Sequence, residues 1–208
     1  SKGQTLVYRA INRLDRDTTG LLVIAKHLLA GCILSDQMLN RQIHRQYRAI
    51  VCGKTEKEGI IDAPIGRAED STVLRRIDFE HGETARTRYR LLSYDEEKDL
   101  SYISLKLDTG RTHQIRVHMS WQGHPLFNDE RYGGDRILKG TTFAKYRQFI
   151  ENCFAVMPRH ALHARLLGFE HPATHENVLF ESPLPADFQS LLTKWNIYTS
   201  AAKETKEN

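Results

Sequence analysis

The chain has 208 residues, with 30 lysines and arginines against 26 aspartates and glutamates, a formal net charge of +4 and a pI near 9.0. This length suits one domain with a sizeable core, and the basic balance favours polyanionic partners such as nucleic acid. Three widely spaced cysteines exclude a disulfide framework and favour the reducing cytoplasm, and the longest apolar run, 21–34, is interrupted by charge and too short to span a membrane.

The first part of the chain predicts strands and one helix. Residues 11–20, INRLDRDTTG, crowd charged side chains before the apolar run 21–26, which predicts a buried strand. Residues 27–39 have apolar side chains at helical spacing, so a helix follows. Residues 47–53 predict another strand, and residues 56–67 predict a loop around one short strand.

The middle of the chain predicts a hairpin and a short helix. Residues 84–94 and 99–110 are rich in β-forming residues on either side of the acidic turn DEEK, which indicates two paired strands. From Thr112 the pattern changes to a helix, with Thr112 as its N-cap and Gly123 and Pro125 as its stop. The helix therefore begins directly after the polar stretch DTGR.

The last part of the chain completes the predicted fold. Residues 160–172 and 176–185 predict a late strand pair, residues 186–195 an amphipathic helix, and residues 199–208 a polar, disordered tail. Strands are followed variously by strands and by helices, without a regular βαβ rhythm or a G-x-G-x-x-G loop. We therefore predict an α+β fold with a mixed, mostly antiparallel sheet and flanking short helices and loops.

Polar side chains gather at the start of the helix predicted after Thr112. Arg111, His113, Gln114 and Arg116 surround free backbone N–H groups, where the helix dipole favours an anion such as a phosphate or a carboxylate. If the carboxylate of Asp15 docked there, Arg116 would keep it ionised, as a nucleophile or base requires. A purely structural ion pair explains the same residues, and the spacing alone leaves both interpretations open.

The segment 12–26, NRLDRDTTGLLVIAK, closely resembles the signature H-R-L-D-x-x-T-S-G-L-L-x-x-A-K of the RluA family of RNA pseudouridine synthases. Further matches follow in the family's order at 46–53, 84–92, 107–134 and 159–188. The resemblance implies the pseudouridine synthase fold, with a catalytic domain over residues 1–198. It also implies conversion of uridine in structured ribosomal or transfer RNA to its C-glycoside isomer, without cofactor or metal. The oligomeric state is left open by the sequence, with a monomer as the default expectation.

The resemblance also implies which residues act. Asp15 matches the catalytic aspartate, Arg116 matches the arginine that pairs with it, and Asp17 falls at a variable position. Tyr47 matches the active-site tyrosine, whose ring can stack on uracil and whose hydroxyl lies near the C5 proton, so that a general-base role for Tyr47 is one hypothesis. An ionised carboxylate can add to uracil C6, attack C1′ or remove a C2′ proton, and the sequence leaves these routes open.

A second group of residues is predicted to contact RNA. A stacked uridine has to be flipped into the pocket, and Arg13 and His113 are candidates for the vacated space or for phosphate. The full predicted set of RNA contacts is Arg13, Thr19, Arg111, His113 and Gln114. The sequence departs from the family pattern at three positions: Asn12 replaces a histidine, Thr19 replaces a serine and Asn128 replaces a glycine. The loss of the glycine at position 128 matters if the backbone there needs a positive φ, which other residues resist.

The sequence leaves a second function open. Family members carry strands before this motif, and often an RNA-binding S4 domain before those strands, so we expect the catalytic domain to be incomplete at its N-terminus. A domain that is incomplete in this way could be a non-catalytic RNA-binding module. A third function, a small-molecule hydrolase that uses Asp15, has little support, because no second carboxylate accompanies Asp15 in the sequence.

The histidines do not have the spacing of a zinc site. Arg86, Arg88 and Arg90 share a strand face that either tracks phosphates or is merely solvated.

Overall fold

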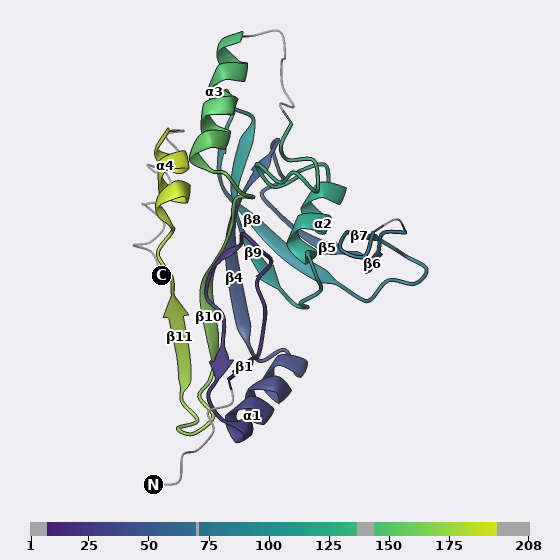
Figure 1. Cartoon of the computed structure of the whole chain (residues 1–208), viewed down its shortest axis with the longest axis vertical. Helices are drawn as coiled ribbons and strands as arrows, with labels where there is room; N and C mark the ends of the chain where they lie inside the picture. Colours follow the sequence, from purple (N-terminus) through teal and green to yellow (C-terminus); the bar gives the residue numbers. More distant parts are fainter. Residues whose placement is uncertain (1–7, 70, 137–143, 195–208) are drawn as a thin grey trace.

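The computed structural model describes residues 8–69, 71–136 and 144–194, and a seven-stranded sheet lies at its centre. The strands are β2 (Thr19–Gly20), β4 (His44–Cys52), β5 (Glu58–Asp62), β8 (Arg86–Asp95), β9 (Leu100–Leu107), β10 (Leu162–Glu170) and β11 (Asn177–Glu181). Their order is β11-β10-β4-β9-β8-β5, with β2 beside β10 (Figure 1). Every pairing is antiparallel except β2 with β10, so the predicted α+β fold with a mixed, mostly antiparallel sheet is confirmed.

In the part of the chain that the structure describes, four helices and two short strand pairs surround the sheet. The helices are α1 (Leu28–Leu39), α2 (Gln114–Trp121), α3 (Ala144–Val156) and α4 (Ala186–Lys194). The pairs are β1 (Arg9–Ala10) with β3 (Ile24–Ala25), and β6 (Ile65–Arg67) with β7 (Arg75–Ile77). In Figure 1, α3 and α4 lie toward one end of the molecule and α1 toward the other. No helix within the described ranges is both long and apolar enough to cross a membrane.

The central strands bury side chains on both faces, because successive residues of a strand point to opposite sides. On β4, Tyr47, Ala49 and Val51 enter a core cluster that also contains Ile115 and Met119 of α2. The intervening Ile50 and Cys52 enter a second cluster with α3 and α4. The sheet therefore separates two cores, and Tyr47 lies on the face covered by α2.

Several predicted elements differ from the observed ones. The strand predicted over 21–26 shrinks to β3, because only two residues pair with β1. The loop predicted over 56–67 contains two strands, β5 and β6, rather than one. The N-cap of α2 is His113, with φ +56, so the assignment of Thr112 was wrong. The predicted tail 199–208 lies outside the described residues.

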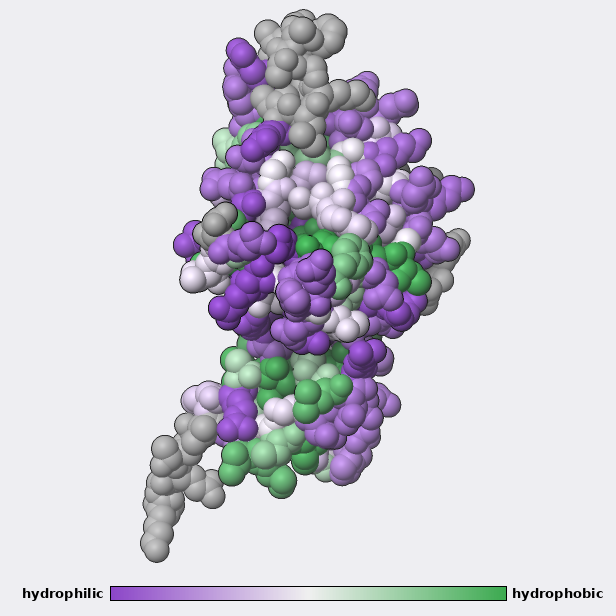
Figure 2. All heavy atoms as spheres, turned by 90° about the vertical axis from the view of Figure 1, so that its right-hand side faces the viewer, coloured by the Kyte–Doolittle hydropathy of each residue, from purple (hydrophilic) through white to green (hydrophobic). Residues whose placement is uncertain are grey.

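Helix α1 confirms the helix predicted over 27–39, but only a narrow stripe of it is buried. Gly31, Leu34 and Gln37 face the protein, whereas Leu28 and Leu29 are 65% and 72% exposed. Figure 2 shows apolar side chains gathered at the lower end of the molecule, where α1 lies, below a largely polar surface. Helical spacing predicted this element correctly, and the tertiary contacts decide how much of it is covered.

Candidate active site

The loop 11–20 is fastened to the start of β10. Gly20 pairs in parallel with Ala164, and the Thr18 and Thr19 hydroxyls lie 2.7 Å from His160 Nε2 and 2.9 Å from His163 Nδ1. The backbone N–H of Thr18 donates to the carbonyl of Asp15 at 3.0 Å and closes a turn. Local turn geometry and two threonine anchors therefore fix where the Asp15 carboxylate points.

Glycine is required at position 20 for two reasons. Its φ is +112°, and a Cβ there would lie 2.2 Å from the carbonyl oxygen of Ala164. The first reason is conformational, since side chains other than glycine resist positive φ. The second is steric, since the loop and β10 touch backbone to backbone.

We expect Gly20→Ala to lower the free energy of unfolding by about 3 kcal/mol or more, because strain and steric overlap add. Gly123→Ala is the matched control: Gly123 also has positive φ (+82°), but a Cβ there meets nothing within 4 Å, so only the conformational cost of about 1 kcal/mol applies. Urea unfolding of both variants measures the difference. Equal losses in the two would refute the close contact.

Arg116 lies between two carboxylates and contacts one of them much more closely than the other. Its Nε and Nη2 donate to the two oxygens of Asp129, each at 2.7 Å, and both side chains are at most 5% exposed. Its Nη1 lies 3.6 Å from Oδ2 of Asp15, an ion pair too long for a hydrogen bond. Asp129 therefore holds the guanidinium in place, while Asp15 faces it at a distance.

The geometry leaves the Asp15 carboxylate free to react. In the part of the chain that the structure describes, no donor hydrogen bonds to its oxygens, and its side chain remains 17% exposed. A nucleophile or base needs an ionised group with an available lone pair. The positive charge of Arg116 faces the carboxylate at 3.6 Å without occupying its oxygens.

Aromatic and imidazole groups complete the surroundings of Arg116. Its guanidinium lies 4.9 Å from the ring centre of Tyr132, a cation–π contact, and the Tyr132 hydroxyl lies 2.8 Å from Nδ1 of His113. Burial alone would lower the pKa of Arg116, but its hydrogen bonds to Asp129 and the charge of Asp15 outweigh that effect and raise it. The guanidinium therefore remains a fixed cation.

Tyr47 and Asp15 line one small cavity of about 50 Å³, together with His113. Tyr47 is only 5% exposed, between Ala164 of β10 and Leu105 of β9. Burial raises the pKa of its hydroxyl; the charge of Asp15 adds to this and that of Arg45 opposes it. The phenol is therefore neutral near pH 7, and its ring is presented to the cavity.

Protonation of a buried histidine should make this site sensitive to acid. Burial, reinforced by the charge of Arg116, lowers the pKa of His160 to about 4, whereas a histidine in the unfolded chain titrates near 6.5. Between these values the unfolded state binds more protons, so the free energy of unfolding falls as the pH drops from about 6.5 to 4, by roughly 3 kcal/mol for this group.

Urea unfolding at several pH values between about 7 and 4 measures this loss. His160→Gln keeps a hydrogen-bonding group near Thr18 but cannot titrate, so its stability should depend less on pH than that of the wild type. A wild type that is equally stable at both ends of this range would contradict the assignment.

Four of the five predicted RNA contacts line the cavity: Arg13, Arg111, His113 and Gln114. Arg13 is hydrogen-bonded to the Thr112 hydroxyl, and Arg111 is paired with Glu83. Thr19 bonds to His163 as described. The Gln114 amide accepts from the Arg111 N–H at 2.9 Å and donates to the Arg86 carbonyl at 2.9 Å, so it is engaged within the protein.

Two of the sequence departures have structural explanations. The Asn12 side chain accepts from the N–H of Val23 at 2.8 Å and closes the base of the loop. Asn128 has φ +57°, the conformation for which the resembled signature carries glycine, and its amide donates to the Met157 carbonyl at 2.6 Å. Asparagine adopts positive φ more readily than most residues, so the turn is retained.

Sequence reasoning missed three residues of this site: Asp129, Tyr132 and His160. Asp129 was the most accessible to prediction, since it lies two residues after the apolar stretch PLF and buried charges need partners. Among the described residues, no group of three or more histidine, cysteine, aspartate or glutamate side chains could hold a metal ion. Trp121 is half exposed and packs edge-to-face with Phe79.

The chain is similar to known proteins over most of its length. A family model described as RNA pseudouridylate synthase matches residues 1–121. The chain is 42% identical over 183 residues to the Bacillus subtilis protein named uncharacterized RNA pseudouridine synthase YjbO, covering 88% of this chain and 57% of that protein. It is 44% identical over 182 residues to ribosomal large subunit pseudouridine synthase D of Nitrosomonas europaea, covering 88% and 49%.

Structural similarity extends to a human protein. The solved structure of human RNA pseudouridylate synthase domain containing 1 superposes with a TM-score of 0.69 at 26% identity, covering 89% of this chain and 73% of that chain. The present chain spans about half the length of the curated relatives it matches.

Proposed function

Since the chain belongs to the RNA pseudouridylate synthase family, we propose that it isomerises uridine in RNA to pseudouridine, with Asp15 as the catalytic group. The observation that carries the proposal is the placement of Asp15. Its carboxylate lines a cavity, faces the buried cation of Arg116 at 3.6 Å and lies on the same cavity as Tyr47. A structural ion pair would instead bring the two groups into direct hydrogen bonds, as Asp129 does.

The chemistry needs an ionised carboxylate beside a held base. Asp15 adds to C6, attacks C1′ or removes the C2′ proton, the N1–C1′ bond breaks and the base turns. C5 then joins C1′, and Asp15 is regenerated as its bond to carbon breaks or as it returns the proton to C2′. The C5 proton passes to water and N1 takes up a proton, so the product is an isomer of uridine. The neutral Tyr47 phenol is a poor base, so we assign its ring to contact with uracil. Arg116 presents its positive charge to Asp15, and Asp129, which accepts two hydrogen bonds from Arg116, keeps that guanidinium oriented.

A base can reach this site only after leaving its stack. Tyr47 is almost completely buried, so uracil has to enter the cavity to touch its ring. Flipping costs a few kcal/mol, which contacts from Arg13, Arg111 and His113 at the mouth would offset. We assign Thr19 and Gln114, whose polar groups are engaged within the protein, to holding the loops of the site.

We further propose structured RNA of the large ribosomal subunit, in the cytoplasm, as the substrate. Support comes from the printed names of several relatives, which are ribosomal large subunit pseudouridine synthases. Asp15, Arg116 and Tyr47 come together within one chain, which is consistent with a monomer.

Release of tritium from RNA labelled at uridine C5 tests the function, because C5 loses its hydrogen only when it forms the new glycosidic bond. We expect the chain to release tritium from total RNA of cells lacking the enzyme. Binding without release would favour the alternative, a non-catalytic RNA-binding module.

A further inference from the structure

A groove of about 780 Å³ adjoins the catalytic cavity, and we call it the basic groove. Its walls come from residues 10–13, 38–45, 86–88 and 106–111, that is, from the N-terminal loop, the end of α1 and the ends of β4, β8 and β9. Seven lining residues are arginine or lysine, and one, Asp108, is acidic. This excess of positive charge is far greater than that of the chain as a whole.

The basic groove adjoins the catalytic cavity and shares part of its lining. Arg13, Arg45 and Arg111 line both hollows. Arg45 packs closely on Gly110, where a Cβ would come within 2.8 Å of its Nη1, and its Nη2 donates to the Thr109 carbonyl at 3.3 Å. A polymer with one unit in the cavity therefore continues past Arg45 into the groove.

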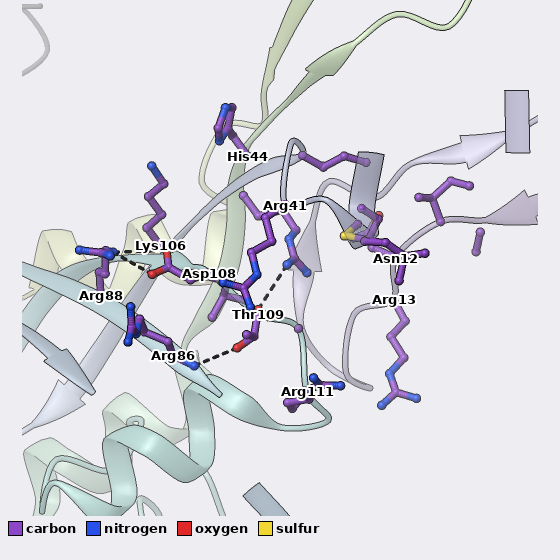
Figure 3. A pocket seen from close by; sticks show the side chains of 18 residues that line it. Asn12, Arg13, Arg41, His44, Arg86, Arg88, Lys106, Asp108, Thr109 and Arg111 are labelled. Carbon is purple, nitrogen blue, oxygen red and sulfur yellow. Dashed lines mark hydrogen bonds and ion pairs between the residues drawn. The ribbon is translucent and has the colours of Figure 1, made fainter. Parts of the chain in front are cut away.

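The groove also passes from one face of the sheet to the other. Arg45 and Tyr47 are two residues apart on β4 and share the active-site face, whereas Gln46 points to the opposite side. Lys106 of β9 lies directly across from Gln46 and from Arg88 of β8, so Lys106 and Arg88 lie on that opposite face. Figure 3 shows Lys106 and Arg88 on one side of the hollow and Arg13 on the other.

The cations of the groove differ in how they are neutralised. Arg88 is paired with Asp108 at 2.9 Å and Arg86 with Asp62. Within the described ranges, Arg41, Arg45 and Lys106 have no carboxylate at ion-pair distance, and Nε of Arg45 is buried without a hydrogen-bond partner. These three side chains have charge available for a ligand.

The lining favours phosphates over bases as that ligand. None of the lining residues is phenylalanine, tyrosine or tryptophan, the residues on which unpaired bases stack. Arginine and lysine without such platforms contact backbone phosphates, which carry no sequence information. A double helix is too stiff to turn around the strand ends within a few nucleotides, so a single strand fits the path.

We infer that the basic groove binds the sugar–phosphate backbone of the single strand next to the target nucleotide. It leads that strand from the catalytic cavity around the ends of β4 and β9 to the opposite face of the sheet. The inference rests on the proposed function and defines the RNA around the target uridine: one flank is unpaired.

The test is the salt dependence of binding to fluorescein-labelled oligoribonucleotides of about 12 nucleotides, one of uridine only and one of mixed sequence. Each phosphate contact contributes about 0.7 to the slope of log affinity against log salt for single strands. We expect Lys106→Gln and Arg41→Asn each to reduce the slope by about that amount with both oligonucleotides. Asparagine at position 41 suits its φ of +60°.

Arg90→Gln is the matched control, because Arg90 is exposed on the same face of β8 as Arg88 but does not line the groove. It should bind RNA with the wild-type slope. An equal change in this control, or unchanged slopes in the groove variants, would overturn the inference. Tritium release by the same proteins separates the two proposals. If the proteins release tritium but the salt slopes of the groove variants equal that of the wild type, only the proposal for the groove is refuted. If the salt slopes change but no tritium is released, only the proposed isomerase activity is refuted.

Discussion

Asp15→Asn is expected to reduce tritium release from C5-labelled RNA by about 10³-fold or more, because the amide can neither attack carbon nor accept a proton as a carboxylate does. RNA affinity should stay within about twofold of wild type, since the side chain of Asp15 makes no hydrogen bond among the described residues. The substitution preserves shape, so the fold should be retained. Release under saturating RNA, and anisotropy with the same RNA, measure the two effects separately.

Asp17→Asn is the matched control for this prediction. Asp17 lies two residues away in the same loop, is exposed, and has φ +73°, which asparagine tolerates. It pairs only with its exposed neighbour Arg16 among the described residues. Tritium release should therefore be close to wild type, and a comparable loss in both variants would show that loop charge, rather than a catalytic carboxylate, is what matters.

Asp129→Ala is expected to lower the free energy of unfolding by about 3–5 kcal/mol, because it leaves the buried guanidinium of Arg116 without its paired carboxylate. Activity should fall as well, since Arg116 would lose the contact that orients it toward Asp15. Asp129→Asn keeps a hydrogen-bond acceptor and should lose less stability. Urea unfolding at pH 7 and tritium release measure the two consequences.

Asp62→Ala provides the exposed counterpart. Asp62 pairs with Arg86, and both side chains are nearly half exposed. Solvent screens such pairs, so the loss should not exceed about 1 kcal/mol. If Asp129→Ala and Asp62→Ala cost the same, the pair at Arg116 is not the buried anchor that its geometry indicates.

The site could be predicted in part because its motifs are short and local. The segment 12–26 places Asp15 at a fixed offset from Gly20, and the pairing of Asp15 with Arg116 inferred from resemblance corresponds to an ion pair in the structure. Asp129 could not be predicted in the same way. Its role depends on being within hydrogen-bonding distance of Arg116, thirteen residues away and on another segment, which no periodicity encodes.

Strand and helix patterns were reliable where the segment's own residues decide the structure. The hairpin β8–β9, the pair β10–β11 and helix α1 all occur where apolar periodicity placed them. The strand predicted over 21–26 fails because pairing requires a neighbouring strand, and β1 offers only two residues to it. The N-cap of α2 is His113 rather than Thr112, because the backbone takes the left-handed conformation at His113 and becomes helical only after it. The residue types alone do not predict this conformation.

The sequence by itself determined the family, through motifs that resemble it, and the mostly antiparallel α+β architecture, through local patterns of residue type. Through the same resemblance it predicted Asp15 as the reactive carboxylate. Only the tertiary structure decided that Asp129, not Asp15, holds Arg116 by hydrogen bonds, and that Tyr47 is buried at the cavity. It also decided that arginines and lysines from four separate segments form one groove. Such relations depend on distance and burial, and these arise only when strands distant along the chain pair in one sheet.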